Sequence, residues 1–467
     1  YQGLEKLDTR GYLTLSDPLY AVLDTVTAWR NTEVLTGGRV SVGRVGERLE
    51  ISPAALSVAG GQIKLSGGWG DPGNFTTQVS SEKVDLERLL RFLGRPPRMR
   101  GVVDALASLS IRDGHLALSG TLAAVDGEFS QLPFSRLNSE FSLKNNRLAF
   151  KQLDWQHQDG AIAITGELIY AQNETSLSGV GLLDSLNLRG QLTDFQFHDL
   201  QPVLPWRQET YGYVTGSFTA TGTIDDPVYT AQLSATNPRF DRVIGEQLTG
   251  RMRYERERLV FDDLDLMTAT GVYMGSGSLP ADLKPTAVKL DVIKDAPVDL
   301  TFAGTTTQLD FLTPYFADID SLNGEYKIEL SLSGTFEQLI RNGKLTATNA
   351  KVELFVMENP ITGIECELLL TDNLLTFEHL EGNTPRGQRR GRDNSHLSLS
   401  GTMDMTRFFK PVFDLQLAGE HVYFTRPLGE IEAVGSPRFT IAGRDTVYFR
   451  GEFIPDPDQA FFRMDFT

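Results

Sequence analysis

One pattern of apolar residues and two glycines occurs four times along this chain, and it limits the possible folds more than any other feature of the sequence. The copy LAFKQLDWQHQDGAIAITGEL at 148–168 serves as the template. Moving 99 positions back (148 to 49) gives a copy at 49–69, and moving 111 forward (148 to 259) gives a copy at 259–279, both without a gap. A fourth copy starts at 375 and resumes at 397 after the insert NTPRGQRRGRDN. Four copies in order indicate a repeat protein with a period of about 110 residues.

Within each copy the apolar residues fall on every second position, which is the period of a strand with one buried face. The first glycine of a copy, at 61, 160 or 271, lies where the chain reverses, and we expect a turn with positive φ there. The second glycine, at 67, 166, 277 or 401, lies inside a strand pattern and indicates a bulge that curves the sheet. Each copy therefore predicts part of a meander in a curved antiparallel sheet.

The apolar positions of the four copies are predicted to share one face of that sheet. They are Leu49, Ile51, Leu56, Ile63, Leu65 and Trp69 in the first copy; Leu148, Phe150, Leu153, Trp155, Ile162, Ile164 and Leu168 in the second; Leu259, Phe261, Leu264, Leu266, Tyr273 and Leu279 in the third; and Leu375, Phe377, Leu380, Leu397, Leu399 and Met403 in the fourth. Trp69 and Trp155 suit a filled core as well as the wall of a groove.

Short amphipathic segments lie between the sets of strands, and each is predicted to be a short helix. They are DLERLLRFLG at 85–94, DLQPVLPW at 199–206, LDFLTPYF at 309–316 and DMTRFFKP at 404–411, with SDPLYAVLDTVTAW at 16–29 as a candidate fifth. Each is too short to be stable alone, so we expect its apolar edge to dock on the sheet.

The repeat unit is thus a short helix followed by roughly six to eight strands. This organisation predicts a partial first repeat over 1–84, full repeats over 85–198, 199–309 and 310–404, and a truncated further repeat over 405–467. The predicted fold is all-β with a few short helices, in one elongated, curved, largely antiparallel sheet. The apolar face of such a sheet must be hidden by a second sheet, by closure of the sheet on itself, or by an apolar partner.

Composition excludes several functions. A net charge of −17 and a pI near 4.9 argue against nucleic acid as a partner, because little would neutralise phosphates. The single cysteine, Cys366, excludes an intramolecular disulfide framework and is expected to be a small buried hydrophobe. The chain has no signal-peptide pattern and no apolar stretch long enough for a membrane span. Because both ends resemble cut edges, we expect a piece of a longer protein whose anchor lies outside it.

No pattern for catalysis, metal binding or a cofactor stands out. The six histidines are scattered, without an HExxH or Cys/His array, and no GxSxG or P-loop is present. Carboxylates alternate on polar faces or lie in turns such as 455–458, so a glycosidase-like pair is a weak alternative. The basic run RGQRRGR at 386–392 suits a solvated loop, or a contact with anionic headgroups or an acidic partner.

Three phrases resemble the AsmA-like/TamB family: GYVTGSFTATGTIDDPVYTAQLSATNPRF, LNGEYKIELSLSGTFEQLIRNGKLTATNAKVEL and GSPRFTIAGRDTVYFRGEF. The likeness covers nearly the whole chain and lies in recurring short patterns and not in a single long motif. It consists of glycines that flank alternating apolar residues, a GT…DP turn from Gly222 to Pro227, and the strand openings NRLAF and ERLVF.

The resemblance implies a sheet rolled into a U-shaped, taco-like groove, lined by the apolar positions named above, as in the repeating β-groove bridge proteins. Family members are anchored in the inner membrane, cross the periplasm and are thought to carry phospholipid towards the outer membrane. TamB itself is also linked to outer-membrane protein assembly with an Omp85-type barrel. We therefore expect a non-enzymatic, periplasmic lipid-transfer segment that binds phospholipid acyl chains, with inner-membrane proteins and an Omp85-type barrel as further partners.

Three other functions stay open. One is a structural or adhesive β-repeat with a dry core, another is a periplasmic scaffold for outer-membrane protein assembly, and the third is a β-solenoid enzyme acting on polysaccharide. An enzyme of that kind would need clustered carboxylates along one cleft, which the sequence does not display.

Overall fold

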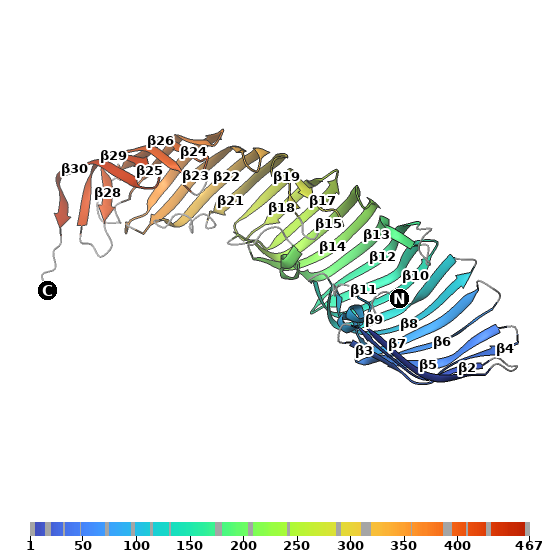
Figure 1. Ribbon diagram of the computed structural model, residues 1–467. Helices are drawn as coiled ribbons and strands as arrows, with labels where there is room; N and C mark the ends of the chain where they lie inside the picture. The colour runs from blue at the N-terminus through green and yellow to red at the C-terminus, as the bar shows by residue number, and fades with distance from the viewer. Residues whose placement is uncertain are drawn as a thin grey trace, which may run out of the picture. The chain divides into compact units, whose positions relative to one another are not determined.

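A computed structural model gives the fold, and it confirms the all-β prediction. It describes residues 5–14, 20–30, 33–46, 48–70, 74–94, 99–112, 115–129, 132–172, 180–203, 209–240, 243–285, 291–309, 319–355, 357–385, 395–407, 410–425 and 431–462. Within these ranges thirty strands belong to one sheet, and every pair with a described register is antiparallel (Figure 1). The described residues contain one α-helix and one 3-10 helix.

The chain divides into two compact units. Unit 1 comprises Tyr1–Ala235, Arg253–Glu257 and Leu283–Asp291, and unit 2 comprises Thr236–Met252, Arg258–Asp282 and Val292–Thr467. This division differs from the five repeats predicted from the sequence, whose boundaries stay a prediction.

Fourteen strands and both helices lie wholly in unit 1. They are β1 (Lys6–Thr14), β2 (Tyr20–Arg30), β3 (Glu33–Gly37), β4 (Val40–Val45), β5 (Arg48–Val58), β6 (Gly61–Trp69), β7 (Phe75–Asp85), α1 (Leu86–Phe92), β8 (Met99–Arg112), β9 (His115–Phe129), β10 (Leu132–Lys144), β11 (Arg147–His157), β12 (Gly160–Gln172), β13 (Val180–Gln196), η1 (Phe197–Val203) and β14 (Thr210–Thr223).

The remaining strands belong to unit 2 or contribute residues to both units. Those with residues in both are β15 (Pro227–Phe240), β17 (Gln247–Glu255) and β20 (Asp291–Val292). Those in unit 2 are β16 (Val243–Ile244), β18 (Arg258–Met267), β19 (Gly271–Asp282), β21 (Pro297–Gln308), β22 (Ile319–Thr335), β23 (Leu339–Leu354), β24 (Ile361–Thr371), β25 (Leu374–Asn383), β26 (His396–Asp404), β27 (Val412–Glu420), β28 (Val422–Thr425), β29 (Ile431–Gly443) and β30 (Val447–Phe462).

The repeat in the sequence corresponds to a repeated β-bulge. The ladder skips between Ile51 and Ala54, Phe150 and Leu153, Phe261 and Leu264, and Phe377 and Glu381. The second glycine of each copy pairs with the residue just before the skip. A Cβ at Gly166 would lie 2.1 Å from the backbone oxygen of Asn187, and its φ is +127°. The bulge prediction is confirmed, and the glycine is explained by the close approach of the next strand.

The prediction for the first glycine of each copy is wrong in its detail. Gly61, Gly160 and Gly271 begin β6, β12 and β19, and none of them has a positive φ. In the first two copies the positive φ falls earlier, for example at Ala59 and Gln158. Gly61 is required for a different reason, because a Cβ there would lie 2.4 Å from the backbone oxygen of Lys83.

The strands of unit 2 bend around one apolar cluster, here called the crease of unit 2. Its buried members are Leu309, Tyr326, Ala347, Ala350, Ile364 and Cys366. Ile328 and Leu345 reach it from one side of the register shifts in β22 and β23, and Leu322 and Val352 reach it from the other. Since residues on both sides of the shifts converge on one cluster, the apolar face lies on the inside of the bend.

Unit 1 has a crease of its own, made of Val103, Ala124, Phe134 and Leu137, with Trp155 packed against it. The Phe134 and Trp155 rings meet edge to face with centroids 5.3 Å apart, and Trp155 Nε1 donates to the backbone oxygen of Pro133 at 3.0 Å. Trp155 therefore acts here as a core filler with a satisfied donor.

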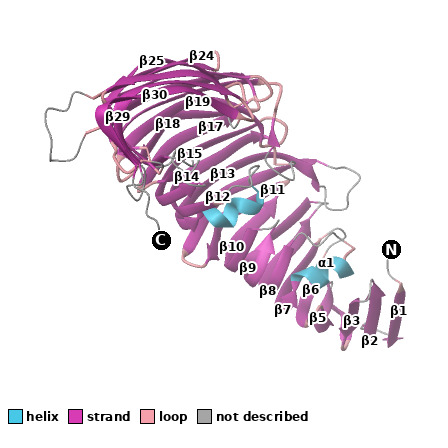
Figure 2. Cartoon of the chain, turned by 90° about the vertical axis from the view of Figure 1, so that its left-hand side faces the viewer, coloured by secondary structure: helices cyan, strands magenta, loops and turns pink. Residues whose placement is uncertain are grey.

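The helix predictions have mixed outcomes. The segment at 85–94 forms α1, which contacts β7 and β8, and the segment at 199–206 begins as the 3-10 helix η1 (Figure 2). The candidate at 16–29 is wrong, because Tyr20–Arg30 is strand β2. Val22, Thr25, Val26 and Thr27 are β-branched, and pairing with β1 outweighs the helix-like opening. The segment at 309–316 lies outside the described residues except for Leu309, and at 404–411 the described residues contain no helix.

Candidate functional site

The candidate functional surface is the apolar face itself, and in unit 1 it contains a row of six leucines. Register places Leu109, Leu118, Leu143, Leu148, Leu168 and Leu186 side by side on the adjacent strands β8 to β13. This set is the leucine row. Leu186 is buried, and the other five are partly exposed. Six neighbouring strands thus present the same side chain at the same level.

Two rows in unit 2, here called the unit 2 wall, continue for eleven positions each without a charged residue. The first comprises Leu264, Gly275, Phe302, Leu330, Gly343, Leu370, Leu375, Met403, Phe413, Gly443 and Val447. The second comprises Leu266, Tyr273, Gly304, Ile328, Leu345, Leu368, Phe377, Gly401, Leu415, Ile441 and Phe449. A Cβ at Gly304 would lie 2.4 Å from the Tyr273 ring, so the aromatic ring covers the glycine.

All twenty-five residues predicted from the repeat lie on the apolar face of their own unit, because each pairs through the ladder with another apolar-face residue or stands two positions from one. Leu397 and Met403 are buried, Trp69 is well exposed, and most of the others are partly exposed. That they contact lipid stays a prediction.

The sequence reasoning missed much of this face. Leu109, Leu118 and Leu143 lie outside the repeat template, as do Leu330 and the apolar-face residues of β27 to β30. The signal was available as simple alternation, as in ALASLSI at 105–111.

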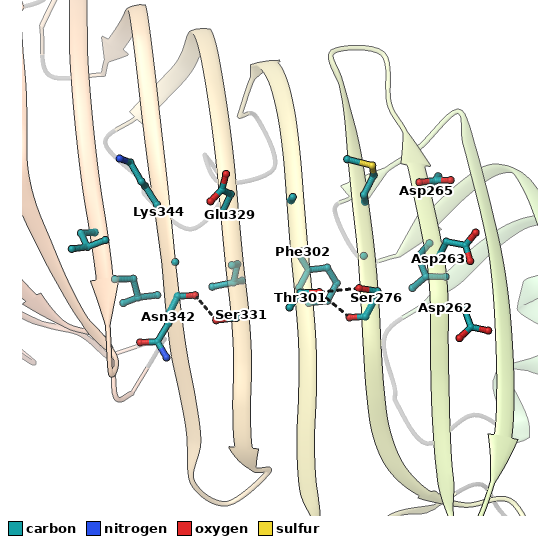
Figure 3. Close-up of a pocket in the computed structure, with 18 of the residues that line it drawn as sticks. Asp262, Asp263, Asp265, Ser276, Thr301, Phe302, Glu329, Ser331, Asn342 and Lys344 are labelled. Carbon is teal, nitrogen blue, oxygen red and sulfur yellow. Dashed lines mark hydrogen bonds between the residues drawn. The ribbon is translucent and has the colours of Figure 1, made fainter.

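The opposite face is polar over the same strands. The row one position away from the leucine row reads Ser108, Ser119, Ser142, Ala149, Glu167 and Asn187. In unit 2 a hollow of about 700 Å³ is lined by residues of β18, β19 and β21 to β24, which include both polar-face residues such as Glu329 and Lys344 and wall residues such as Phe302 (Figure 3). Within it the hydroxyls of Ser276 and Thr301 lie 2.9 Å apart, and Ser331 Oγ donates to the backbone oxygen of Asn342 at 3.3 Å. The charged side chains of the hollow include Asp263, which forms an ion pair with Arg251, and Lys344, which forms one with Glu367.

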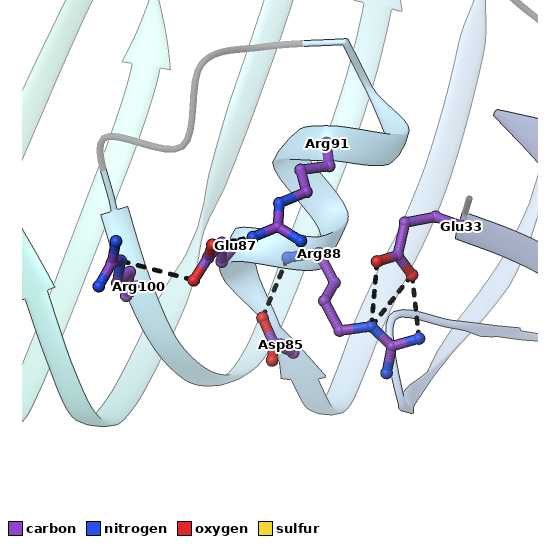
Figure 4. A network of polar contacts seen from close by, with 6 residues as sticks. All are labelled: Glu33, Asp85, Glu87, Arg88, Arg91 and Arg100. Atoms are coloured by element: carbon purple, nitrogen blue, oxygen red, sulfur yellow. Dashed lines mark hydrogen bonds and ion pairs between the residues drawn. The ribbon is translucent and has the colours of Figure 1, made fainter. Parts of the chain in front are cut away.

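Helix α1 covers part of the apolar face of unit 1, and polar contacts fix its position (Figure 4). Asp85 caps it by accepting from the Arg88 backbone N–H at 3.0 Å. The Arg88 guanidinium binds the buried carboxylate of Glu33 through Nε at 3.0 Å and a terminal nitrogen at 2.9 Å, and this contact raises the pKa of Arg88. Leu89 and Phe92 pack on the cluster that also contacts Ile63. The helix therefore shields the part of the face nearest β3 and β7.

Burial shapes the chemistry of the unit 2 crease. It raises the pKa of Tyr326 to about 12 and that of the Cys366 thiol to about 11. Both groups are thus neutral at ordinary pH, and Cys366 is a buried hydrophobe as predicted.

Signals of other functions are weak in the described part of the chain. No group of three or more His, Cys, Asp or Glu residues there is placed to hold a metal. No helix in the same ranges is long and apolar enough to cross a bilayer. The basic run at 386–392 lies outside the described residues.

No family model matches this sequence, and no curated protein or solved structure was found to be similar to it.

Proposed function

We propose that this chain is a segment of a bridge-like lipid-transfer protein, whose apolar face carries phospholipid acyl chains through the periplasm between inner and outer membranes. The observation that carries the proposal is the leucine row together with the unit 2 wall. They are long, uncharged and partly exposed, and no second sheet covers them among the described residues. The sequence resemblance to AsmA-like/TamB proteins supports the same function and extends it to inner-membrane proteins and an Omp85-type barrel as partners at the two ends.

The size of the surface suits an acyl chain. Six strands spaced about 4.8 Å apart give the leucine row a length of about 24 Å. One leaflet contributes half of a hydrocarbon core that is about 30 Å thick, so an acyl chain lying across the strands fits on the row. Each buried CH₂ contributes about 0.8 kcal/mol, which is enough to extract a chain from water without any polar contact.

Transport along such a surface needs no chemistry. The leucine row and the unit 2 wall contain no hydrogen-bonding side chain apart from the Tyr273 hydroxyl, so a sliding chain breaks no polar contact as it moves. This supports a non-enzymatic function without cofactor or metal.

The test is extraction of bound lipid from the purified chain, followed by mass spectrometry. Leu148→Asp places a charge in the leucine row, and Ala149→Asp places the same charge on the adjacent residue of the polar face. Leu330→Asp and Ser331→Asp are the corresponding pair in unit 2. We expect phospholipid on the wild-type chain, much less bound phospholipid on the two leucine variants, and little change on the two polar-face variants. The reason is that an acyl chain covering the introduced carboxylate would remove its hydration, which costs free energy.

Circular dichroism of all four variants shows whether they fold. A folded, lipid-free wild-type chain would contradict the proposal and favour the structural β-repeat. Unfolding of both leucine variants alone would show that the wall is a closed core.

A further inference from the structure

One charged side chain interrupts the apolar face of unit 2 just beyond its wall. Arg341 pairs with Leu332 in the ladder between β22 and β23, two residues from Gly343 of the wall. It therefore stands on the apolar face, at the end of the strands near the β24–β25 turn. Its position is partly buried rather than extended into solvent.

Among the residues that the structure describes, the guanidinium of Arg341 has only a neutral partner. One terminal nitrogen donates to Asn373 Oδ1 at 3.1 Å, and the Arg341 backbone N–H donates to the same oxygen at 3.1 Å. Arg341 forms no ion pair with any described residue. A guanidinium has five N–H donors, so most of its donors stay available in a fixed orientation.

The position in unit 1 that corresponds to Arg341 is occupied by an apolar residue. Leu375 is the counterpart of Leu148 in the repeat; the ladder leads from Leu148 through Leu143 to Leu118, and from Leu375 through Leu370 to Gly343. Arg341, two residues before Gly343, therefore corresponds to Leu116, two residues before Leu118, which pairs with Leu109, while Leu116 pairs with Ile111. Unit 1 thus places leucine where unit 2 places an unneutralised cation.

We propose that Arg341 binds the phosphate of a phospholipid headgroup whose acyl chain lies on the unit 2 wall. The inference rests on the proposed function and adds where the headgroup sits. Guanidinium and phosphate form charge-assisted, often bidentate hydrogen bonds, and the contact is stronger beside an apolar surface than in open water. Asn373 holds the guanidinium in place without neutralising it.

The test compares phosphatidylglycerol with diacylglycerol of the same acyl chains, supplied together in phosphatidylcholine-free vesicles, and measures the ratio of the two lipids bound. Wild type is expected to favour phosphatidylglycerol. Arg341→Leu, which copies the natural residue of unit 1, is expected to lower that ratio about fivefold while total bound lipid is kept. Arg341→Lys keeps the positive charge but loses the paired N–H donors of the guanidinium, so it should give an intermediate lipid ratio. Lys327→Gln, on the polar face of β22, is the matched control and should leave the ratio unchanged.

Two results would overturn the assignment. One is an equal lipid ratio in wild type and Arg341→Leu. The other is binding of inorganic phosphate without lipid that Arg341→Leu abolishes, because it would indicate a free-anion site. A wild-type chain that binds neither lipid would instead refute the proposed function, and this inference with it.

Discussion

Tyr326 and Phe302 lie on the same apolar face of unit 2, yet their surroundings differ sharply. Tyr326 is 6% exposed in the crease, whereas Phe302 is 39% exposed on the wall two ladder rows away. The difference arises from the bend, because the register shifts bring two limbs of each strand together over Tyr326 and not over Phe302. One alternating pattern therefore produces two surroundings, a buried crease and a wall whose side chains stay partly exposed.

The sharpest test of that contrast is a pair of truncations. Tyr326→Ala should lower the free energy of unfolding of unit 2 by about 3–5 kcal/mol, as for other buried aromatic residues. Phe302→Ala should cost only about 1 kcal/mol, because its ring is already half in water. The single cysteine of the chain lies in the unit 2 crease, so thiol labelling of Cys366 in denaturant reports on this unit. Equal losses in the two variants would contradict the division into crease and wall.

Alkaline pH should weaken the crease before the wall. Cys366 and Tyr326 have raised pKa values of about 11 and about 12, against ordinary values of 9.0 and 10.0. Groups with raised pKa values contribute stability in full below the unfolded-state pKa and lose it as pH rises through the folded-state pKa. The loss thus falls between pH 9 and pH 12, with about 4 kcal/mol gone at pH 11. Melting temperatures should fall less steeply over this range in Cys366→Ala/Tyr326→Phe than in wild type, and parallel curves would refute the assignment.

The bulge glycines should be far more sensitive than a turn glycine. Gly277 has φ of +131°, and a Cβ there would lie 2.1 Å from the backbone oxygen of Asp299. Gly277→Val should cost about 1–3 kcal/mol through strain and overpacking. Gly46 has φ of +64° with nothing within 4 Å of a Cβ, so Gly46→Ala should cost under about 1 kcal/mol. Denaturation curves of both variants decide the point, and a milder effect at Gly277 would contradict the role of the bend.

The smallest effect is expected where α1 meets the apolar face. Asp85→Ala removes the cap of a seven-residue helix and should cost about 1 kcal/mol. Trp155 lies against the crease of unit 1, so tryptophan fluorescence in denaturant follows this change. No shift of the midpoint would mean that the Arg88–Glu33 contact alone holds the helix.

The sequence was sufficient to predict the class of fold and the composition of one face. Alternation around Leu148 and Ile162 determined which side chains share a face, because the period of a strand permits no other arrangement. The alternation could not predict that Tyr326 is buried and Phe302 exposed, since burial there depends on register shifts between strands that lie far from any turn signal. Strand β2 was misjudged because a local cap signal at 16–18 was given more weight than pairing with β1. Arg341 was overlooked because its significance appears only when register aligns it with Leu116.

The uniformity of the leucine row affects how many lipid molecules the chain would bind at saturation. Since each strand repeats the same side chain at the same level, an acyl chain bound as proposed would find equivalent positions about every 4.8 Å. The amount of lipid bound at saturation would then be set by the length of the leucine row and not by a number of discrete sites. Lipid capacity should then change in proportion to the strands added or removed, and molecules on the row should advance in single file.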